Sequence, residues 1–117
     1  MFDSIMNVLE ELNTLLAPAL PVETGVFSEA APAEYLVLTP LTDSFDLFAD
    51  GHPLMDVCEV RISLFSKGNY LARKKQITEI LLDGDFTITG RYFARHEDDT
   101  GYYHYCIDAA KEYETED

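Results

Sequence analysis

Apolar residues recur along the chain with two different periods, which separate predicted helices from predicted strands. Residues 3–17 follow the helical period, and Pro18 should end this helix because proline cannot continue the hydrogen-bond ladder. Its apolar stripe consists of Ile5, Leu9, Leu12 and Leu16, widened by Phe2, Met6 and Leu15. A second helix is predicted over 70–83, with Asn69 as its N-cap and Gly84 in the left-handed conformation after its end. Its inward residues are expected to be Ala72, Ile77, Ile80 and Leu81.

Four segments have the pattern of β-strands, namely 35–41, 57–65, 86–95 and 102–110. The segment 57–65 alternates most clearly, with Cys58, Val60, Ile62 and Leu64 on one face. The segment 35–41 is apolar on both faces, which indicates an inner strand. Before it, only a short extended piece is expected within 22–27. The order α-β-β-α-β-β predicts the α+β class, with two helices packed on one mainly antiparallel sheet of about four strands.

The segment 43–56 separates the first two predicted strands and is too long for a tight turn, since most hairpin loops have about 2 to 5 residues. It therefore predicts a projecting loop, in which apolar residues are mixed with aspartates. Exposed aromatic residues on such a loop indicate contact with a partner, and the alternative is that they fold back over the edge of the core. The residues expected to make the contact are Asp43, Phe45, Asp46, Leu47, Phe48 and Asp50. Residues 111–117 are expected to form a frayed tail of a single domain that spans 1–117.

The charge balance restricts the classes of partner. The chain of 117 residues has 8 Lys and Arg against 22 Asp and Glu, a formal net charge of -14. Proteins that grip phosphates need clustered cations, so this balance argues against nucleic-acid binding. The surplus of acids either keeps the protein soluble or forms a surface past which DNA can slide. No apolar run reaches the roughly 18 residues of a membrane span, and the N-terminus lacks a basic signal-peptide flank. We therefore expect a cytoplasmic protein without a membrane partner.

Candidate chemistry is sparse. Cys58 and Cys106 lie in strand-like segments without metal-ligand spacing and are expected to be buried free thiols. If the last hairpin brings its two histidines together, a divalent cation could bind among His96, Glu97, Asp98, Asp99 and His104. That pattern matches neither an EF-hand nor a zinc motif, and polar residues are ordinary at a turn, so we expect no metal site.

The only basic run, Arg73 to Lys75, spreads around a helix and favours a solvated face over a phosphate clamp. The alternative for this run is a patch that docks an acidic neighbouring subunit. The chain contains neither a nucleophile elbow nor a glycine-rich phosphate loop. We therefore expect that the protein is not an enzyme and that it has no catalytic residue and no cofactor.

Five segments in their order resemble the tail terminator and head–tail completion proteins of long-tailed, siphovirus-like bacteriophages and prophages. They are YLVLTPL at 35–41, SFDLFADGHP at 44–53, VRISLFSKGNY at 60–70, RKKQITEILLDGDF at 73–86 and HEDDTGYYHYCIDAAKEYE at 96–114. With the N-terminal helix they cover nearly the whole chain. None of these segments carries chemistry, so the resemblance depends on the ordered set.

The resemblance implies a ring, usually of six subunits, that caps the head-proximal end of the tail tube and stops its polymerisation. Its implied partners are further copies of itself, the tail tube protein and the head connector or completion protein. DNA would only pass through the central hole. The implied location is the host bacterial cytoplasm during assembly and then the virion.

Other functions fit the same pattern. The chain could be a head completion or adaptor protein of the phage neck, or the tube subunit, although a tube subunit usually needs a longer chain. It could also be a small acidic binding module unrelated to phage, such as a mimic of DNA charge. A mimic should align its carboxylates on one face, whereas the acids here are scattered along the chain.

Overall fold

The computed structural model describes residues 4–24, 32–49 and 52–114. Within these ranges the chain forms two helices and five strands in the order α1, β1, β2, β3, α2, β4, β5. The helices are α1 (Ser4–Leu16) and α2 (Tyr70–Asp83). The strands are β1 (Val22–Thr24), β2 (Glu34–Ala49), β3 (His52–Ser66), β4 (Thr87–His96) and β5 (Tyr103–Glu114).

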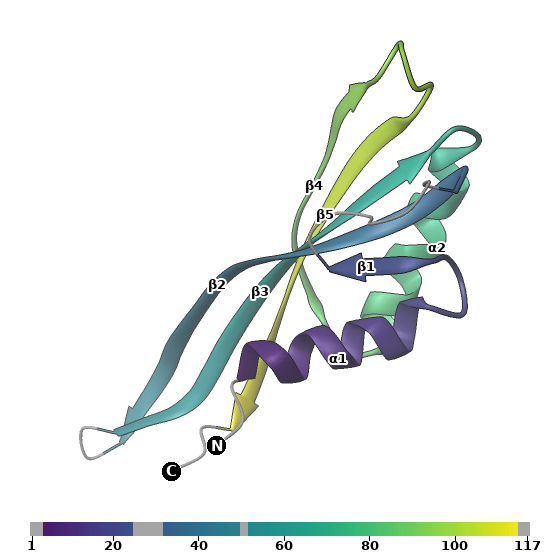
Figure 1. The fold of residues 1–117 in the computed structure, drawn as a ribbon. Helices are drawn as coiled ribbons and strands as arrows, with labels where there is room; N and C mark the ends of the chain where they lie inside the picture. The colour runs from purple at the N-terminus through teal and green to yellow at the C-terminus, as the bar shows by residue number, and fades with distance from the viewer. Residues whose placement is uncertain (1–3, 25–31, 50–51, 115–117) are drawn as a thin grey trace.

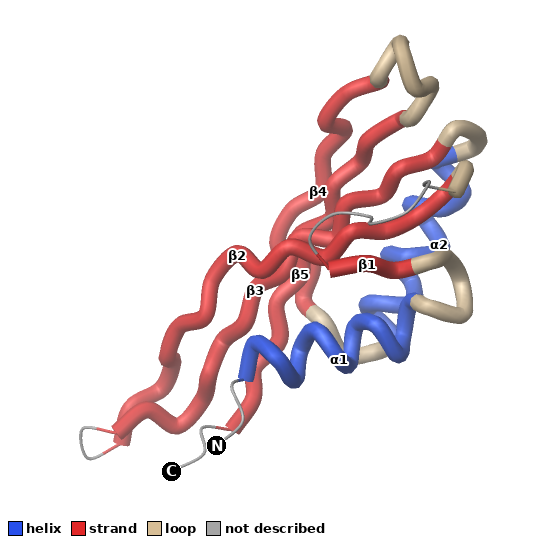
Figure 2. Tube along the Cα trace, in the orientation of Figure 1, coloured by secondary structure: helices blue, strands red, loops and turns tan. Residues whose placement is uncertain are grey.

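All five strands belong to one twisted sheet with the order β1-β2-β3-β5-β4 (Figures 1 and 2). Three of its four strand pairs are antiparallel, and only the short edge strand β1 runs parallel to its neighbour β2. The α+β class and the two helices on a mainly antiparallel sheet are thus confirmed. The expected four strands are wrong by one, because β1 adds a fifth. A three-residue strand has no periodicity of its own, and its place depends on its pairing with β2.

Both helices cover the same face of the sheet, and the core lies between the two layers. Helix α1 packs against β1, β2 and β3, while α2 packs against β3, β4 and β5. Ile62 on β3 and Ile77 on α2 are both completely buried, which confirms that the helices and strands share one core. The core side chains are Val8, Leu12, Leu16, Leu20, Leu36, Leu38, Cys58, Val60, Ile62, Leu64, Ile77, Leu81, Phe86, Tyr105, Ile107 and Ala109.

The buried faces of the two helices agree in part with the faces predicted from the sequence. In α1 the fully buried stripe includes Val8 together with Leu12 and Leu16, so the face is centred on a residue that the expected stripe omitted. In α2, Ile77 and Leu81 are buried, whereas Ala72 is exposed, contrary to expectation. Ala72 lies in the first turn, where its backbone N–H donates to the capping side chain of Asn69.

Helix α2 ends at Asp83 as predicted, but the left-handed conformation lies one residue later than expected. Gly84 has a φ of -87°, and the left-handed conformation falls on Asp85 with a φ of 66°. The N–H groups of Asp85 and Phe86 then donate to the carbonyls of Leu82 and Leu81, which is the Schellman pattern. At position 84 an added Cβ would lie 2.8 Å from Leu15 Cδ1 on α1, so a larger residue would require the Leu15 side chain to shift.

The segment 43–56 is a continuation of two strands and not a projecting loop. Strands β2 and β3 remain paired from Glu34↔Ser66 to Ala49↔His52, with one irregularity between Pro40 and Thr42. Cross-strand hydrogen bonds satisfy the backbone of this segment more completely than a long loop could, which is the physical reason for the difference. The two strands, joined along part of their length by β5, extend away from the helices as an arm (Figure 1). We define the arm as residues 39–49 of β2 and 52–57 of β3.

The arm makes the molecule elongated. Its principal extents are 54 × 25 × 23 Å and its radius of gyration is 15.4 Å. A compact domain of this length has a radius of gyration of about 13.4 Å. Strand β5 continues along the base of the arm to Glu114, so the expected frayed tail is wrong for residues 111–114; residues 115–117 lie outside the described residues.

Candidate functional site

The residues expected to contact a partner are carried by the arm. Asp43, Phe45, Asp46, Leu47 and Phe48 lie within β2, and the register pairs Phe45 with Asp56 and Phe48 with Pro53. Asp50 lies outside the described residues, and the structure does not describe the side chains of the other five. The contacts expected for these residues remain a prediction. The signal for a hairpin was the dipeptide Asp50-Gly51, because Asp-Gly between strand-forming residues favours a two-residue turn.

The sheet has free backbone edges at both of its ends. Strand β1 pairs with only Leu36 to Leu38, so β2 has no further strand on its outer side from Thr39 onward within the described ranges. At the opposite end, β4 is the terminal strand from Thr87 to His96. A free edge presents unpaired N–H and C=O groups and is a template for pairing with another chain. The two edges are thus candidate surfaces for association.

The β4 edge is accessible along most of its length. All of its residues are exposed except Ile88 and Gly90, which are half-buried. Tyr92 and Phe93 are 44% and 45% exposed, which is high for aromatic side chains. Arg91 is exposed and makes no ion pair or hydrogen bond with any described residue, while Arg95 pairs with Glu97 at 3.3 Å. Tyrosine, phenylalanine and arginine are the residues enriched at protein interfaces.

The face of the sheet opposite the helices carries a row of stacked rings. Tyr35 on β2 stacks on Phe65 of β3 with centroids 4.8 Å apart, and Phe65 stacks on His104 of β5 at 4.3 Å. Tyr102 meets Tyr35 edge-on at 5.4 Å and donates its hydroxyl to the carbonyl of Pro32. These contacts join three strands side by side, which makes this row a stabilising feature of the sheet.

An ion pair continues this face toward the arm. Arg61 on β3 donates through Nε and Nη2 to the two carboxylate oxygens of Asp108 on β5, at 2.9 and 3.0 Å. The guanidinium also lies 5.4 Å from the ring centroid of Tyr92 on β4. The carboxylate of Asp108 raises the pKa of Arg61 further above its ordinary value. Arg61 is therefore already neutralised within the chain and is not available to bind a phosphate.

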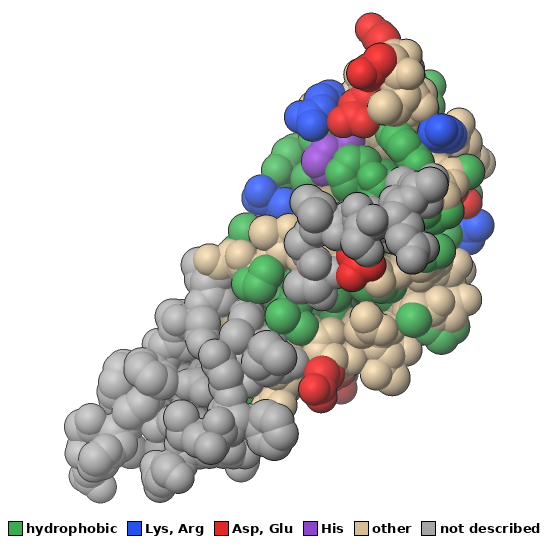
Figure 3. All heavy atoms as spheres, viewed as in Figure 1, with side chains coloured by type: hydrophobic (Ala, Val, Ile, Leu, Met, Phe, Trp, Pro, Cys, Tyr) green, Lys and Arg blue, Asp and Glu red, His purple; other side chains and the backbone are tan. Residues whose placement is uncertain are grey.

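The two histidines considered for a metal site do not converge. His96 pairs with Tyr103 and His104 pairs with Arg95 in the β4–β5 ladder, so neighbouring pairs place the two imidazoles on opposite faces of the hairpin. His96 Nδ1 lies 3.2 Å from Asp98 Oδ1, while His104 lies on the row of rings. Within the described parts of the chain, no group of three or more His, Cys, Asp or Glu residues is placed to hold a metal ion. The carboxylates Glu97, Asp98 and Asp99 instead form an acidic tip of this hairpin (Figure 3).

His104 is partly withdrawn from water. Its Nδ1 atom is buried without a hydrogen-bond partner, and its Nε2 lies 3.5 Å from the Cys106 thiol. Burial lowers the pKa of His104, because desolvation penalises the charged imidazolium, and the nearby Arg95 guanidinium acts in the same direction. Cys58 and Cys106 are both buried, in agreement with the burial expected from their strand placement.

The basic run of α2 is divided among different partners. Arg73 donates to Glu34 at 3.0 Å and to Gln76 at 2.9 Å, and the hydrogen bond from Arg73 lowers the pKa of Glu34. The Lys74 ammonium lies 5.0 Å from the ring centroid of Tyr105. Lys75 is exposed. The three cations therefore do not form one clamp, and two of them are engaged within the chain.

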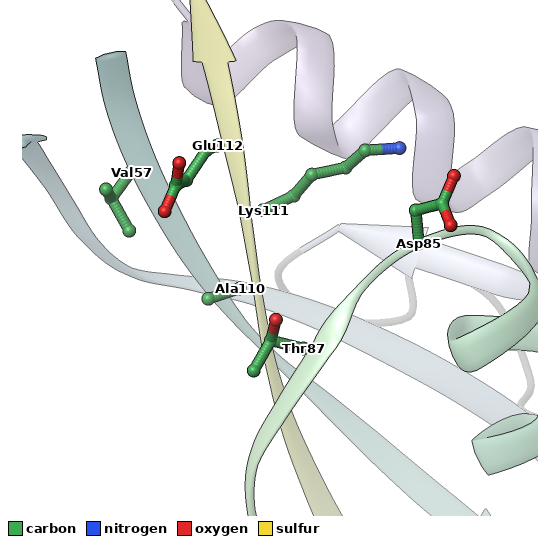
Figure 4. Close-up of a pocket in the computed structure, with 6 residues that line it drawn as sticks. All are labelled: Val57, Asp85, Thr87, Ala110, Lys111 and Glu112. Carbon is green, nitrogen blue, oxygen red and sulfur yellow. The ribbon is translucent and has the colours of Figure 1, made fainter.

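A groove of about 410 Å³ lies beside β5 where β4 begins (Figure 4). It is lined by Val57, Asp85, Thr87, Ala110, Lys111 and Glu112. Lys111 reaches toward α1, where it pairs with Glu11 and donates to the carbonyl of Gly84 at 3.0 Å. The Lys111 ammonium is therefore engaged within the chain.

No helix in the described ranges is long and apolar enough to span a bilayer.

Comparison with known proteins gives little guidance. No protein-family model matches the chain, and no curated protein matches it. Among solved structures it is similar to a chain described as "Virion of native gene transfer agent (GTA) particle". That chain is 14% identical, with a TM-score of 0.48, and the match covers 89% of this chain and 84% of the other. A likeness of this size does not assign a function.

Proposed function

We propose that this chain is a structural protein of a phage particle. In this proposal its copies form a ring on the head-proximal end of the tail tube, stop the growth of the tube and join it to the head. The protein is made in the bacterial cytoplasm and ends in the virion. It catalyses no reaction and needs no cofactor.

The arm is the observation that supports this proposal most directly. Helices α1 and α2 contact the sheet over the core, whereas β2 and β3 continue as paired strands beyond it (Figure 1). An arm of this kind is held by the pairing of its own two strands and exposes backbone that a neighbouring chain can contact. The free backbone edge of β2 from Thr39 onward provides hydrogen-bonding groups for such a contact.

The electrostatics suit a protein that surrounds DNA without binding it. The net charge of -14 opposes the counterion-driven attraction that supplies most non-specific DNA affinity. Arg61 and Arg73 are two of the cations that could attract phosphates, but they form ion pairs with Asp108 and Glu34 respectively. A ring of such subunits would keep DNA on its axis by geometry and repulsion.

Deleting the gene from the prophage that carries it tests this function. We expect tails of irregular length and heads without tails, and both should be corrected by supplying the intact gene. Tails of normal length beside unjoined heads would instead assign the chain to head completion. Virions of normal number and length would contradict both structural roles.

A further inference from the structure

Strand β4 differs in charge from the rest of the molecule. Among the helices and strands of the described structure, β4 (Thr87–His96) is the only one that contains no Asp or Glu, although the chain has 22 acidic residues. It carries Arg91 and Arg95, on opposite faces of the sheet according to their partners Ile107 and His104. The free edge of β4 is therefore flanked by a guanidinium on each side.

The arm has the opposite composition. On the edge strand of the arm, residues 39–49 of β2 contain Asp43 and Asp46 and no Lys or Arg. The arm and β4 also lie at opposite ends of the strand order β1-β2-β3-β5-β4. One chain thus has a free edge strand with acidic residues in its sequence at one end of its sheet, and a free edge strand with arginines at the other.

We propose that β4 of one copy binds the arm of a second copy, with the β2 edge alongside β4 and the aspartates beside Arg91 and Arg95. This contact is head-to-tail, because it joins two unlike surfaces. Repetition of such a contact gives a closed ring when the rotation between copies closes, and a filament otherwise. The inference specifies the subunit contact of the ring proposed above and rests on that proposal.

The irregularities of β4 make the contact selective. The β4–β5 register shifts between Ile88 and Gly90 and again between Phe93 and Arg95. Bulges and charged side chains hinder indiscriminate pairing of an edge strand. Between these two shifts, Gly90–Phe93 is the stretch of β4 with a regular backbone for pairing with a strand of another copy. This stretch contains the exposed Tyr92 and Phe93. Pairing over so few residues depends on the flanking charges, of which Arg95 is shared with Glu97 at 3.3 Å and Arg91 has no ion pair with a described residue. A strand with acidic residues complements these charges.

Disulfide trapping measures this contact even when association is weak. One variant carries Ala94→Cys on β4 and Ser44→Cys on the arm, and Cys58 and Cys106 are left in place because they are buried. Mild oxidation of this variant should give a ladder of multimers on a non-reducing gel. A control that combines Ser44→Cys with Lys75→Cys, at an exposed position of α2, should give no such ladder.

Charge reversal then tests the proposed pairs, in the trapping background. Arg91→Glu with Arg95→Glu should reduce the multimers about tenfold, and so should Asp43→Lys with Asp46→Lys. An equimolar mixture of the two reversed proteins should restore the multimers, because each arm then meets a β4 of opposite charge. Lys75→Glu is the matched control and should have no effect. Circular dichroism of each variant verifies that it is folded.

Equal trapping at Lys75, no trapping at all, or no rescue in the mixture would overturn the proposed contact. These outcomes are distinguishable from failure of the proposed function. If gene deletion gives irregular tails but trapping fails, the ring function stands and a different surface joins the subunits. If trapping and rescue succeed but deletion leaves normal virions, the contact stands and the terminator role falls.

Discussion

At the scale of single residues, the polar side chains of this protein mostly satisfy one another. Arg61 and Asp108 neutralise each other across β3 and β5, and Arg73 with Ser66 holds the Glu34 carboxylate. Burial and a hydrogen bond to Glu11 raise the pKa of Tyr113 above its ordinary range. Among the buried side-chain polar atoms of the described residues, His104 Nδ1 is the one without a hydrogen-bond partner. Among the described residues, His104 is therefore the one whose protonation should link pH to the stability of the fold most directly.

We predict that His104 makes the fold less stable as the pH falls below 6.5, the ordinary pKa of histidine. Because the folded state lowers this pKa, the unfolded chain binds the proton more readily between 6.5 and the folded value. The free energy of unfolding should therefore decrease across that window and be unaffected by His104 above it. Urea unfolding at pH 7.5 and 5.5 measures the decrease. His104→Phe, which keeps a ring beside Phe65, should lose less stability between these two pH values.

The carboxylates Glu34 and Glu97 also have lowered pKa values, through hydrogen bonds from Arg73 and Thr100 respectively. Their contributions are lost only below about pH 4.5, so they do not overlap with the window of His104. Equal losses in the wild-type protein and in His104→Phe would contradict the assignment.

At the scale of elements, the helices and the arm are stabilised in different ways. Helix α2 is defined by local groups: Asn69 accepts from the Ala72 N–H at 3.2 Å, and the hydrogen bonds of Asp85 and Phe86 close its end. The arm depends on hydrogen bonds between residues distant in the sequence, such as those near Asp43 and Cys58. Leu38 and Cys58 are the described core residues of β2 and β3 that lie next to the arm. The arm extends the sheet beyond the helices (Figure 1).

We predict that the arm contributes to assembly and little to folding. Phe45→Ser with Phe48→Ser should change the free energy of unfolding by about 1 kcal/mol or less, as substitutions outside a core usually do. The same double variant should fail to restore normal tails in a strain that lacks the gene. Ile62→Ala provides the contrast, because removing this fully buried side chain should cost about 2 to 5 kcal/mol. A double variant that unfolds like Ile62→Ala would show that the phenylalanines belong to the core.

At the scale of the whole molecule, charge and shape both support the proposed role as a subunit of an assembly that surrounds DNA. The chain is elongated, with extents of 54 × 25 × 23 Å, strongly acidic, and has unlike free edges at the two ends of its sheet. Such a subunit can join its neighbours through the arm while its net charge repels phosphates. The acidic tip formed by Glu97, Asp98 and Asp99 adds to this repulsion at the end of the β4–β5 hairpin (Figure 3).

We predict no measurable affinity of the isolated protein for duplex DNA, even at low salt. At low ionic strength the repulsion between its net charge and the phosphates is screened least, so these are the conditions in which the charge effect is largest. An electrophoretic mobility shift assay at about 20 mM salt, with a basic DNA-binding protein as positive control, tests this. A shift at micromolar protein concentration would identify the chain as a nucleic-acid reader.

The sequence by itself determined the features that depend on near neighbours. The bounds of α2, its Asn69 cap and the alternation of Cys58 to Leu64 all agree with the pattern of residues. Their hydrogen bonds and steric limits involve residues only a few positions apart, so the information is local.

Tertiary structure decided the features that depend on distant partners. The parallel edge strand β1, the length of the arm and the separation of His96 from His104 follow from the register between strands, which hydrophobic alternation alone does not set. The role of Gly84 was likewise decided by the approach of Leu15 from another helix. For the candidate site, the sequence identified a projecting acidic segment, but only the sheet order placed it opposite the basic β4 edge, because strands far apart in the chain become the two ends of one sheet.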